Sequence, residues 1–238
     1  MTAPLIAVEG LFCGYEGREV LAGLSFSLAP KERLGLAGHT GSGKTTLLKT
    51  IMGLHTPRAG TVRIEGRECS VERDFALARK KIGYLFQNPD DQLFCPALLE
   101  DVAFGPLNLG ATPDEARAIA EECLQLVGLA GFEDRLTHCL SGGEKRLASL
   151  AGVLAMRPRG LLLDEPTTGL DPESIDRVAG VLCGLDLAML VVSHEGDFLE
   201  CVTQTQCVLA HGHLHKAEKA AHSHRHTHVL GDFPHSHE

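Results

Sequence analysis

Residues 34–48 read LGLAGHTGSGKTTLL, and this stretch decides the fold class. An apolar run suited to a β-strand ends at Gly38, a glycine-rich turn follows, and a helical pattern begins near Lys44. Gly38, four intervening residues, Gly43, Lys44 and Thr45 reproduce the full spacing of a phosphate-binding loop. Glycines permit backbone angles that let successive amides converge on one anion, and the positive end of the helix dipole lies at the same point. The stretch therefore predicts a nucleoside triphosphate site on an α/β core.

The residue types of this loop predict specific contacts. Lys44 would reach the β- and γ-phosphates, and the Thr45 hydroxyl would ligate Mg²⁺. The alternative is an ordinary glycine turn between a strand and a helix, which the complete spacing argues against. We expect the following loop residues to bind the nucleotide: Gly38, His39, Thr40, Gly41, Ser42, Gly43, Lys44, Thr45 and Thr46.

Composition limits the functions open to the chain. Its 238 residues, 44% of them hydrophobic, suffice for one large domain with a smaller lobe. A formal net charge of -9 argues against nucleic acid as a partner. The 8 cysteines include no close C-x-x-C pair, which favours reduced thiols in a cytosol. No apolar run is long enough to cross a membrane and the N-terminus lacks a signal-peptide pattern, so we expect any membrane role to act through a partner.

Periodicity predicts elements on both sides of the loop. Residues 82–86 have the pattern of a buried strand, and an Asn-Pro-Asp turn after Gln87 then changes the character of the sequence. Residues 114–127 and the stretch after LSGGEKR have helical periodicity. We interpret residues 88–158 as a helical sub-lobe inserted into the α/β core. Further strands are predicted over residues 6–8, 20–28 and 61–66.

Two acids follow the apolar strand of GLLLDEP, residues 160–166. Because ligand sites in open α/β sheets lie at the carboxyl ends of the strands, both acids should face the phosphate loop. Asp164 is then placed to hold Mg²⁺ and Glu165 to polarise an attacking water, the alternative being a pair of solvated turn acids. The next apolar strand leads to His194 at the same edge, although a histidine at a strand end is by itself more often merely hydrogen-bonded.

LSGGEKR, residues 140–146, resembles the signature sequence of ATP-binding cassette (ABC) ATPases, and it stands between the phosphate loop and the two acids as in that family. Gln87 resembles the family's Q-loop glutamine, residues 169–171 its D-loop and His194 its switch histidine. Tyr15 resembles its adenine-stacking aromatic, although a lone tyrosine in a loop is often only a packed surface residue. The resemblance covers roughly residues 5–215.

The resemblance implies an α/β fold of the P-loop NTPase type, with an N-terminal antiparallel β subdomain and an inserted helical subdomain at about residues 88–158. It implies that Lys44, Gln87, Glu165 and His194 are catalytic and that ATP and Mg²⁺ are the cofactors. Thr45, Gln87 and Asp164 would hold Mg²⁺. It further implies head-to-tail pairing with a second copy or a paralogous ATPase subunit, in which one chain's phosphate loop faces the partner's signature residues Ser141, Gly142 and Gly143.

QNPDDQLF and EDVAFGPLNLG, residues 87–94 and 100–110, are similar to sequences in ATPase subunits of energy-coupling-factor importers, especially those for cobalt or nickel. This implies integral membrane transport subunits as partners and a peripheral position at the cytoplasmic face of the inner membrane. A groove for a helix of the membrane subunit is expected at Gln92 and its apolar neighbours, although these residues could equally form an internal core patch. An importer for a vitamin or zinc, and a soluble ABC ATPase without a transport role, remain alternatives. The apolar neighbours are Leu93, Phe94, Leu98 and Leu99.

Residues 211–238 form a histidine-rich stretch, which we expect to be a disordered tail beyond an ATP-binding domain of residues 1–210. Alternating histidines in an extended chain put their imidazoles on one side, and imidazole binds Ni²⁺, Co²⁺ and Zn²⁺. The tail is therefore a candidate transition-metal site, the alternative being a polar segment without a role. The alternating residues are His222, His224, His226 and His228.

Overall fold

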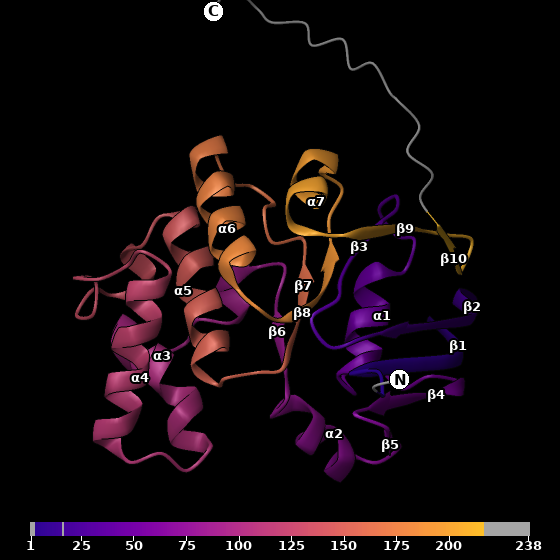
Figure 1. Ribbon diagram of the computed structural model, residues 1–238, viewed down its shortest axis with the longest axis horizontal. Coiled ribbons are helices and arrows are strands. Elements are labelled where there is room, and N and C mark those ends of the chain that lie inside the picture. Colours follow the sequence, from indigo (N-terminus) through magenta and orange to yellow (C-terminus); the bar gives the residue numbers. More distant parts are fainter. Residues whose placement is uncertain (1–2, 16, 217–238) are drawn as a thin grey trace, which may run out of the picture.

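The computed structural model describes residues 3–15 and 17–216, which form two β-sheets with helices packed against them (Figure 1). One sheet is antiparallel and holds strands from the first third of the chain. Its spatial order is β2 (Arg18–Leu28), β1 (Ile6–Tyr15), β4 (Ala59–Ile64) and β5 (Arg67–Cys69). This sheet corresponds to the predicted N-terminal antiparallel β subdomain.

The second sheet carries the strands that lead to the candidate site. Its inner strands pair in parallel, and an antiparallel strand closes one edge. Its spatial order is β10 (His213–Lys216), β9 (Thr205–Ala210), β3 (Arg33–Ala37), β8 (Ala188–Val192), β7 (Gly160–Asp164) and β6 (Ile82–Leu85).

Helices connect these strands. Figure 1 shows α3 to α6 gathered on one side of the parallel strands, with α1 and the antiparallel sheet on the other. Two short 3₁₀ turns cover Pro89–Asp91 and Thr137–Cys139. The helices are α1 (Lys44–Ile51), α2 (Glu72–Arg79), α3 (Leu98–Asn108), α4 (Pro113–Leu126), α5 (Gly142–Ala155), α6 (Pro172–Gly184) and α7 (Gly196–Val202).

The unbroken apolar run of β7 is explained by two separate cores. Leu161 and Leu163 pack into the core shared with α3 to α6, whereas Leu162 packs into the core shared with α1 and the antiparallel sheet. Successive side chains of a strand point to opposite faces, so a strand covered on both faces has to be apolar throughout. β7 therefore lies between the two cores, as does the neighbouring strand β8.

Helices α3, α4 and α5 pack on one another and line the first core together with β7 and β8. The helix predicted at residues 114–127 is α4, and a capping box between Thr112 and Glu115 fixes its start. The second predicted helix is α5, which begins inside the LSGGEKR stretch at Gly142. Whether these helices form a unit separate from the α/β core remains a prediction.

Two predicted boundaries were wrong. The first strand, predicted over residues 6–8, extends to Tyr15 as β1, because its pairing with β2 continues as far as Tyr15 and Arg18. The folded body also extends through Lys216, past the predicted boundary after residue 210, because β10 pairs with β9 in register. The four alternating histidines of the predicted tail lie outside the described residues. Within the described residues, no helix is both long and apolar enough to cross a membrane.

Two glycines give a matched test of the contact between β6 and α5. A Cβ atom at Gly83 would stand 2.3 Å from Val153 Cγ1, whereas one at Gly152 would meet no atom within 4 Å. We expect Gly83→Ala to destabilise the protein by about 1–3 kcal/mol through overpacking. Gly152→Ala should instead stabilise it by about 0.5–1 kcal/mol, because alanine loses less backbone entropy in a helix. Urea unfolding of both variants measures the difference, and equal effects of one sign would contradict the packing described.

Candidate nucleotide-binding site

The phosphate loop connects β3 to α1, and two of its glycines are required by close contacts. Gly43 has a φ of +108°, and a Cβ atom there would lie 2.5 Å from Val20 Cγ1. A Cβ at Gly38 would lie 2.6 Å from the carbonyl oxygen of Leu209. The loop is thus pressed against β2 and β9, and side chains at these two positions would push it out of place.

The N-terminus of α1 is open to an anion. Gly43 provides no capping side chain, and the first turn of α1 contains no acidic residue. α5 differs, because the Ser141 hydroxyl and the Glu144 carboxylate cap its first turn. Backbone donors and the positive dipole end of α1 therefore remain for a ligand, which is the arrangement that binds phosphate.

The Lys44 side chain lies over the same loop and is largely buried. Its Nζ donates to the carbonyl oxygens of Gly38, at 2.7 Å, and His39, at 3.3 Å, and lies 3.8 Å from Glu165 Oε1. Among the described residues this is the one carboxylate that pairs with the Lys44 ammonium, so the buried charge retains capacity for a further anion.

Asp164 ends β7 almost completely buried. Its Oδ1 accepts from the Thr45 hydroxyl at 3.0 Å, and its Oδ2 accepts from the Tyr84 hydroxyl at 3.1 Å. Burial raises the pKa of Asp164, while the hydrogen bonds from Thr45 and Tyr84 oppose this rise. A carboxylate and a hydroxyl side by side are hard oxygen donors, and a divalent cation beside them would favour the ionised form of Asp164.

Glu165 follows Asp164 in a left-handed backbone conformation, with a φ of +48°. Its amide donates to the Val192 carbonyl at 2.9 Å, which holds this conformation against the end of β8. The Glu165 Oε2 atom lies 2.8 Å from His194 Nδ1 and also accepts from the His194 amide at 3.3 Å. The carboxylate is thus oriented by His194, whose ring is mostly exposed.

The aromatic ring of Tyr15 borders the site and is 53% exposed. Its hydroxyl lies 3.4 Å from Thr46 Oγ1, and its ring is tilted against the His55 ring at a centroid distance of 4.9 Å. The Tyr15 ring thus packs against His55, and enough of it remains exposed to stack on a planar ligand.

A cavity of about 420 Å³ brings these groups together. Tyr15, Gln87 and Glu165 line it, together with most of the phosphate loop. Asp164 and His194 contact lining residues instead of forming its wall. The complete lining is Tyr15, Arg18, Val20, Thr40, Gly41, Gly43, Lys44, Thr45, Thr46, Gln87 and Glu165.

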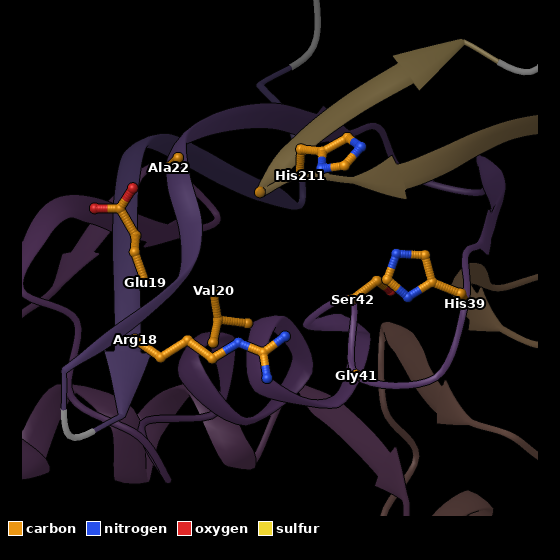
Figure 2. Close-up of a pocket in the computed structure, with 9 residues that line it drawn as sticks. Arg18, Glu19, Val20, Ala22, His39, Gly41, Ser42 and His211 are labelled. Atoms are coloured by element: carbon orange, nitrogen blue, oxygen red, sulfur yellow. The ribbon is translucent and has the colours of Figure 1, made fainter.

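Not every predicted nucleotide-binding residue lines this cavity. His39 and Ser42 line a second cavity of about 340 Å³, which Arg18 and His211 also line (Figure 2). The signature residues Ser141, Gly142 and Gly143 line neither cavity, and the first two are exposed at the start of α5.

Two other predictions can be compared with the structure. Gln92 was expected to line a groove for a partner helix. Its side chain instead makes hydrogen bonds within the chain, accepting from the Phe86 amide at 3.1 Å and donating to the Ser149 carbonyl at 3.2 Å. Leu98 belongs to the core, as the alternative interpretation had it, whereas Phe94 is exposed. Within residues 3–15 and 17–216, no group of three or more His, Cys, Asp or Glu side chains is placed to hold a metal ion.

Sequence reasoning missed Tyr84, Arg18 and Arg146. Tyr84 lies on β6 with its hydroxyl on Asp164, and Arg18 lines both cavities. Arg146 is fully buried beneath Gln87. Tyr84 was detectable in principle, because a polar aromatic in an otherwise apolar buried strand needs a hydrogen-bond partner.

The chain resembles known proteins over most of its length. A family model described as ABC transporter matches residues 21–168. A putative ABC transporter ATP-binding protein of Brucella suis is 50% identical over 92% of this chain and 92% of its own length. An energy-coupling factor transporter ATP-binding protein, EcfA, of Methanothermobacter thermautotrophicus is 41% identical over 88% of this chain and 69% of its own length.

Solved structures resemble the fold closely. CbiO1 from Clostridium perfringens, described as part of the ABC transporter complex cbiONQ, superposes with a TM-score of 0.81 at 31% identity, covering 89% of this chain and 86% of that chain. The bacterial ABC transporter cassette MJ0796, solved as a dimer, has a TM-score of 0.80 at 26% identity, covering 89% and 97%.

Proposed function

Because the chain belongs to the ABC transporter family and is one of its ATPases, we propose that it drives a membrane importer of the energy-coupling-factor type. The observation that carries the proposal is the division of the ATP site. The phosphate loop, Gln87 and Glu165 line one cavity, while the signature residues lie outside it at the exposed start of α5. Such a site would be completed by a second chain.

Hydrolysis is assigned to the chain's own residues as follows. Lys44 and the loop amides bind the phosphate oxygens, and the Tyr15 ring stacks on the adenine of ATP. Glu165 accepts a proton from the attacking water as the new phosphorus–oxygen bond forms and ADP leaves. His194 holds the Glu165 carboxylate in the required direction through the 2.8 Å contact.

Mg²⁺ fits the oxygen donors at the end of β7. Thr45 and Asp164 would hold the ion together with Gln87, and the ion would neutralise charge on the phosphate oxygens. The burial of Asp164 supports this assignment. Burial raises the pKa of the carboxyl group, and a bound cation would offset this by stabilising the ionised form.

Pairing would be head to tail, with Ser141, Gly142 and Gly143 of each chain facing the phosphate loop of the other. Ser141 and Glu144 cap each other at the start of α5, which uses the amides of these two residues, while Ser141 and Gly142 are exposed. The Ser141 hydroxyl and the Gly142 amide would therefore be the groups offered to the partner's nucleotide. The similarity to MJ0796, whose structure is dimeric, supports pairing of two such chains.

The surface for the membrane subunit is proposed around Phe94 and Phe104. Their rings pack edge to face at 4.7 Å, with 62% of Phe94 and 44% of Phe104 exposed. Leu107 adds a further exposed apolar side chain on α3. Exposed aromatic side chains on a helical surface suit an apolar helix of a partner.

The proposed cargo is a cobalt or nickel ion. The likeness of residues 87–94 and 100–110 to cobalt and nickel importers supports it, as do the histidines after Lys216. A vitamin or zinc importer of the same type is the second candidate, favoured by the identity to EcfA proteins, whose names specify no ion. A soluble ABC ATPase would not need the exposed aromatic pair.

Replacing the proposed base tests the hydrolytic assignment. Glu165→Gln should lower kcat about 100-fold or more, because the amide cannot accept the proton, while ATP affinity changes little. Steady-state turnover and equilibrium ATP binding measure the two quantities. The matched control is Glu200→Gln, an exposed acid on α7. Wild-type turnover in the first variant would remove Glu165 from the catalytic role.

Mixing two inactive variants tests the division of the site between chains. Lys44→Ala removes the loop lysine and Ser141→Arg blocks the signature, so each homodimer should be inactive. A 1:1 mixture should recover about a quarter of the wild-type rate, because about half of the dimers are mixed and each mixed dimer has one intact site.

The control mixture combines Lys44→Ala with Glu165→Gln, two lesions on the same half of the site. It should stay inactive, because every site in every dimer then carries a lesion. Recovery in this mixture, or none in the first, would contradict head-to-tail pairing.

Trimming the chain after Lys216 tests the metal proposal. The cut keeps β10, whereas a cut after Ala210 would remove a paired strand. Ni²⁺ affinity measured by calorimetry should fall by about tenfold or more, because the alternating imidazoles are lost, while ATPase activity stays unchanged. A full-length control carries Ser in place of His222, His224, His226 and His228. Undiminished Ni²⁺ affinity in both proteins would exclude these four histidines as the ligands.

A further inference from the structure

Arg146 is a fully buried arginine that hydrolysis, as assigned above, leaves unused. It lies one turn into α5, after the signature residues, and is 1% exposed. Its Nη1 donates to the Phe86 carbonyl at 2.5 Å, and its Nη2 donates to the Gln87 carbonyl. The two arms of the guanidinium therefore hold two successive peptide groups at the end of β6.

Burial of the charged Arg146 side chain carries a desolvation penalty. Among the described residues no carboxylate forms an ion pair with it, and its Nε has no hydrogen-bond partner. Burial lowers the pKa of Arg146 to about 10, while the charge of Asp164 opposes this shift. An apolar side chain of similar volume would avoid the desolvation penalty, so stability alone does not explain an arginine here.

Two further contacts fasten the same segment to α5. Gln92 bridges the Phe86 amide and the Ser149 carbonyl of α5, at 3.1 Å and 3.2 Å. Lys145, also on α5, pairs with Asp90 at 2.6 Å. Residues 86–92 are thus tied to α5 at both ends and in the middle.

We propose that Arg146 is a positioning residue that makes Gln87 follow the position of α5. The inference rests on the proposed function in one respect, namely that Gln87 acts in the ATP cavity. Since α5 begins with Ser141, the same helix would carry the signature to the partner's nucleotide and hold Gln87 of its own cavity. A shift of α5 on closing one site would thereby be transmitted to the other site through the guanidinium.

A double-mutant cycle tests this role. Lysine is a point donor and cannot span two carbonyls as the planar guanidinium does. Arg146→Lys should lower kcat about tenfold or more, with ATP affinity changed by less than about threefold, because the loop and Tyr15 are untouched. Gln87→Ala should cause a loss of similar size. Adding Arg146→Lys to Gln87→Ala should cause less than about a twofold further loss, because both changes act through the same group.

Hydrogen exchange of the full-length chain without nucleotide supplies a readout independent of hydrolysis. Arg146→Lys should speed exchange over residues 86–92, including the Phe86 amide, which donates to Gln92. The matched control is Arg117→Met, an exposed arginine on α4, which should change neither exchange nor kcat. If Arg146→Lys does not fold, Arg146→Gln replaces it, because its amide can still donate to one carbonyl.

The outcomes separate the two ideas. Unchanged exchange over residues 86–92, or losses in kcat that multiply in the double variant, would overturn the role of Arg146. Wild-type kcat in Gln87→Ala would overturn the proposed role of Gln87 in hydrolysis. In that case, faster exchange in Arg146→Lys but not in Arg117→Met would still support Arg146 as the residue that ties this segment to α5.

Discussion

The parallel pairing of β3, β8 and β7 is the constraint on which the site depends. Leu36 pairs with Val192, and Val192 pairs with Asp164, so three segments distant in sequence leave the sheet at one level. The phosphate loop starts after β3, His194 follows β8 and Glu165 follows β7. A change of register in any one pair would move its part of the proposed ATP site out of reach of the other two.

Electrostatics make the same edge receptive to charged ligands. The uncapped N-terminus of α1 and the Lys44 ammonium concentrate positive potential on the loop. Beside the loop, Asp164 is buried and accepts hydrogen bonds from the hydroxyl groups of Thr45 and Tyr84, and burial raises its pKa. Each half carries a charge that the protein alone compensates only in part. A triphosphate together with a divalent cation would compensate both, so binding should stabilise the folded chain.

Much of this site could be predicted from the sequence, because its chemistry is contained in short contiguous motifs. The loop spacing identified the glycines and Lys44, and the apolar run of β7 identified the edge where Asp164 and Glu165 lie. The loop spacing grouped His39 and Ser42 with the other nucleotide-binding residues, but they line the second cavity. Motif spacing alone does not determine which cavity a loop residue borders. The histidine-rich composition predicted a tail from residue 211 onward, but His213–Lys216 pair with β9 as strand β10.

Arg146 could not be predicted for a different reason. Helical periodicity places it beside Leu150 on α5, but periodicity cannot distinguish a cation at the edge of an apolar stripe from one buried beneath it. Its partners are backbone carbonyls, and every residue has a carbonyl, so no residue type in the sequence marks them. Such contacts become visible only when the fold sets two segments against each other.

The two cores suggest how the parts of the site could move relative to one another. The helices that carry the signature pack against one face of β7, and the phosphate loop helix belongs to the core on its other face. Close-packed cores resist internal deformation, so movement would concentrate where the chain passes between them. Residues 86–92 form such a passage, since they leave the parallel sheet after β6 and are tied to α5 by side-chain contacts. Helix α5 and Gln87 would then move together while Lys44 and Glu165 stay with the sheet, which makes the geometry of the ATP cavity sensitive to what the signature end of α5 contacts.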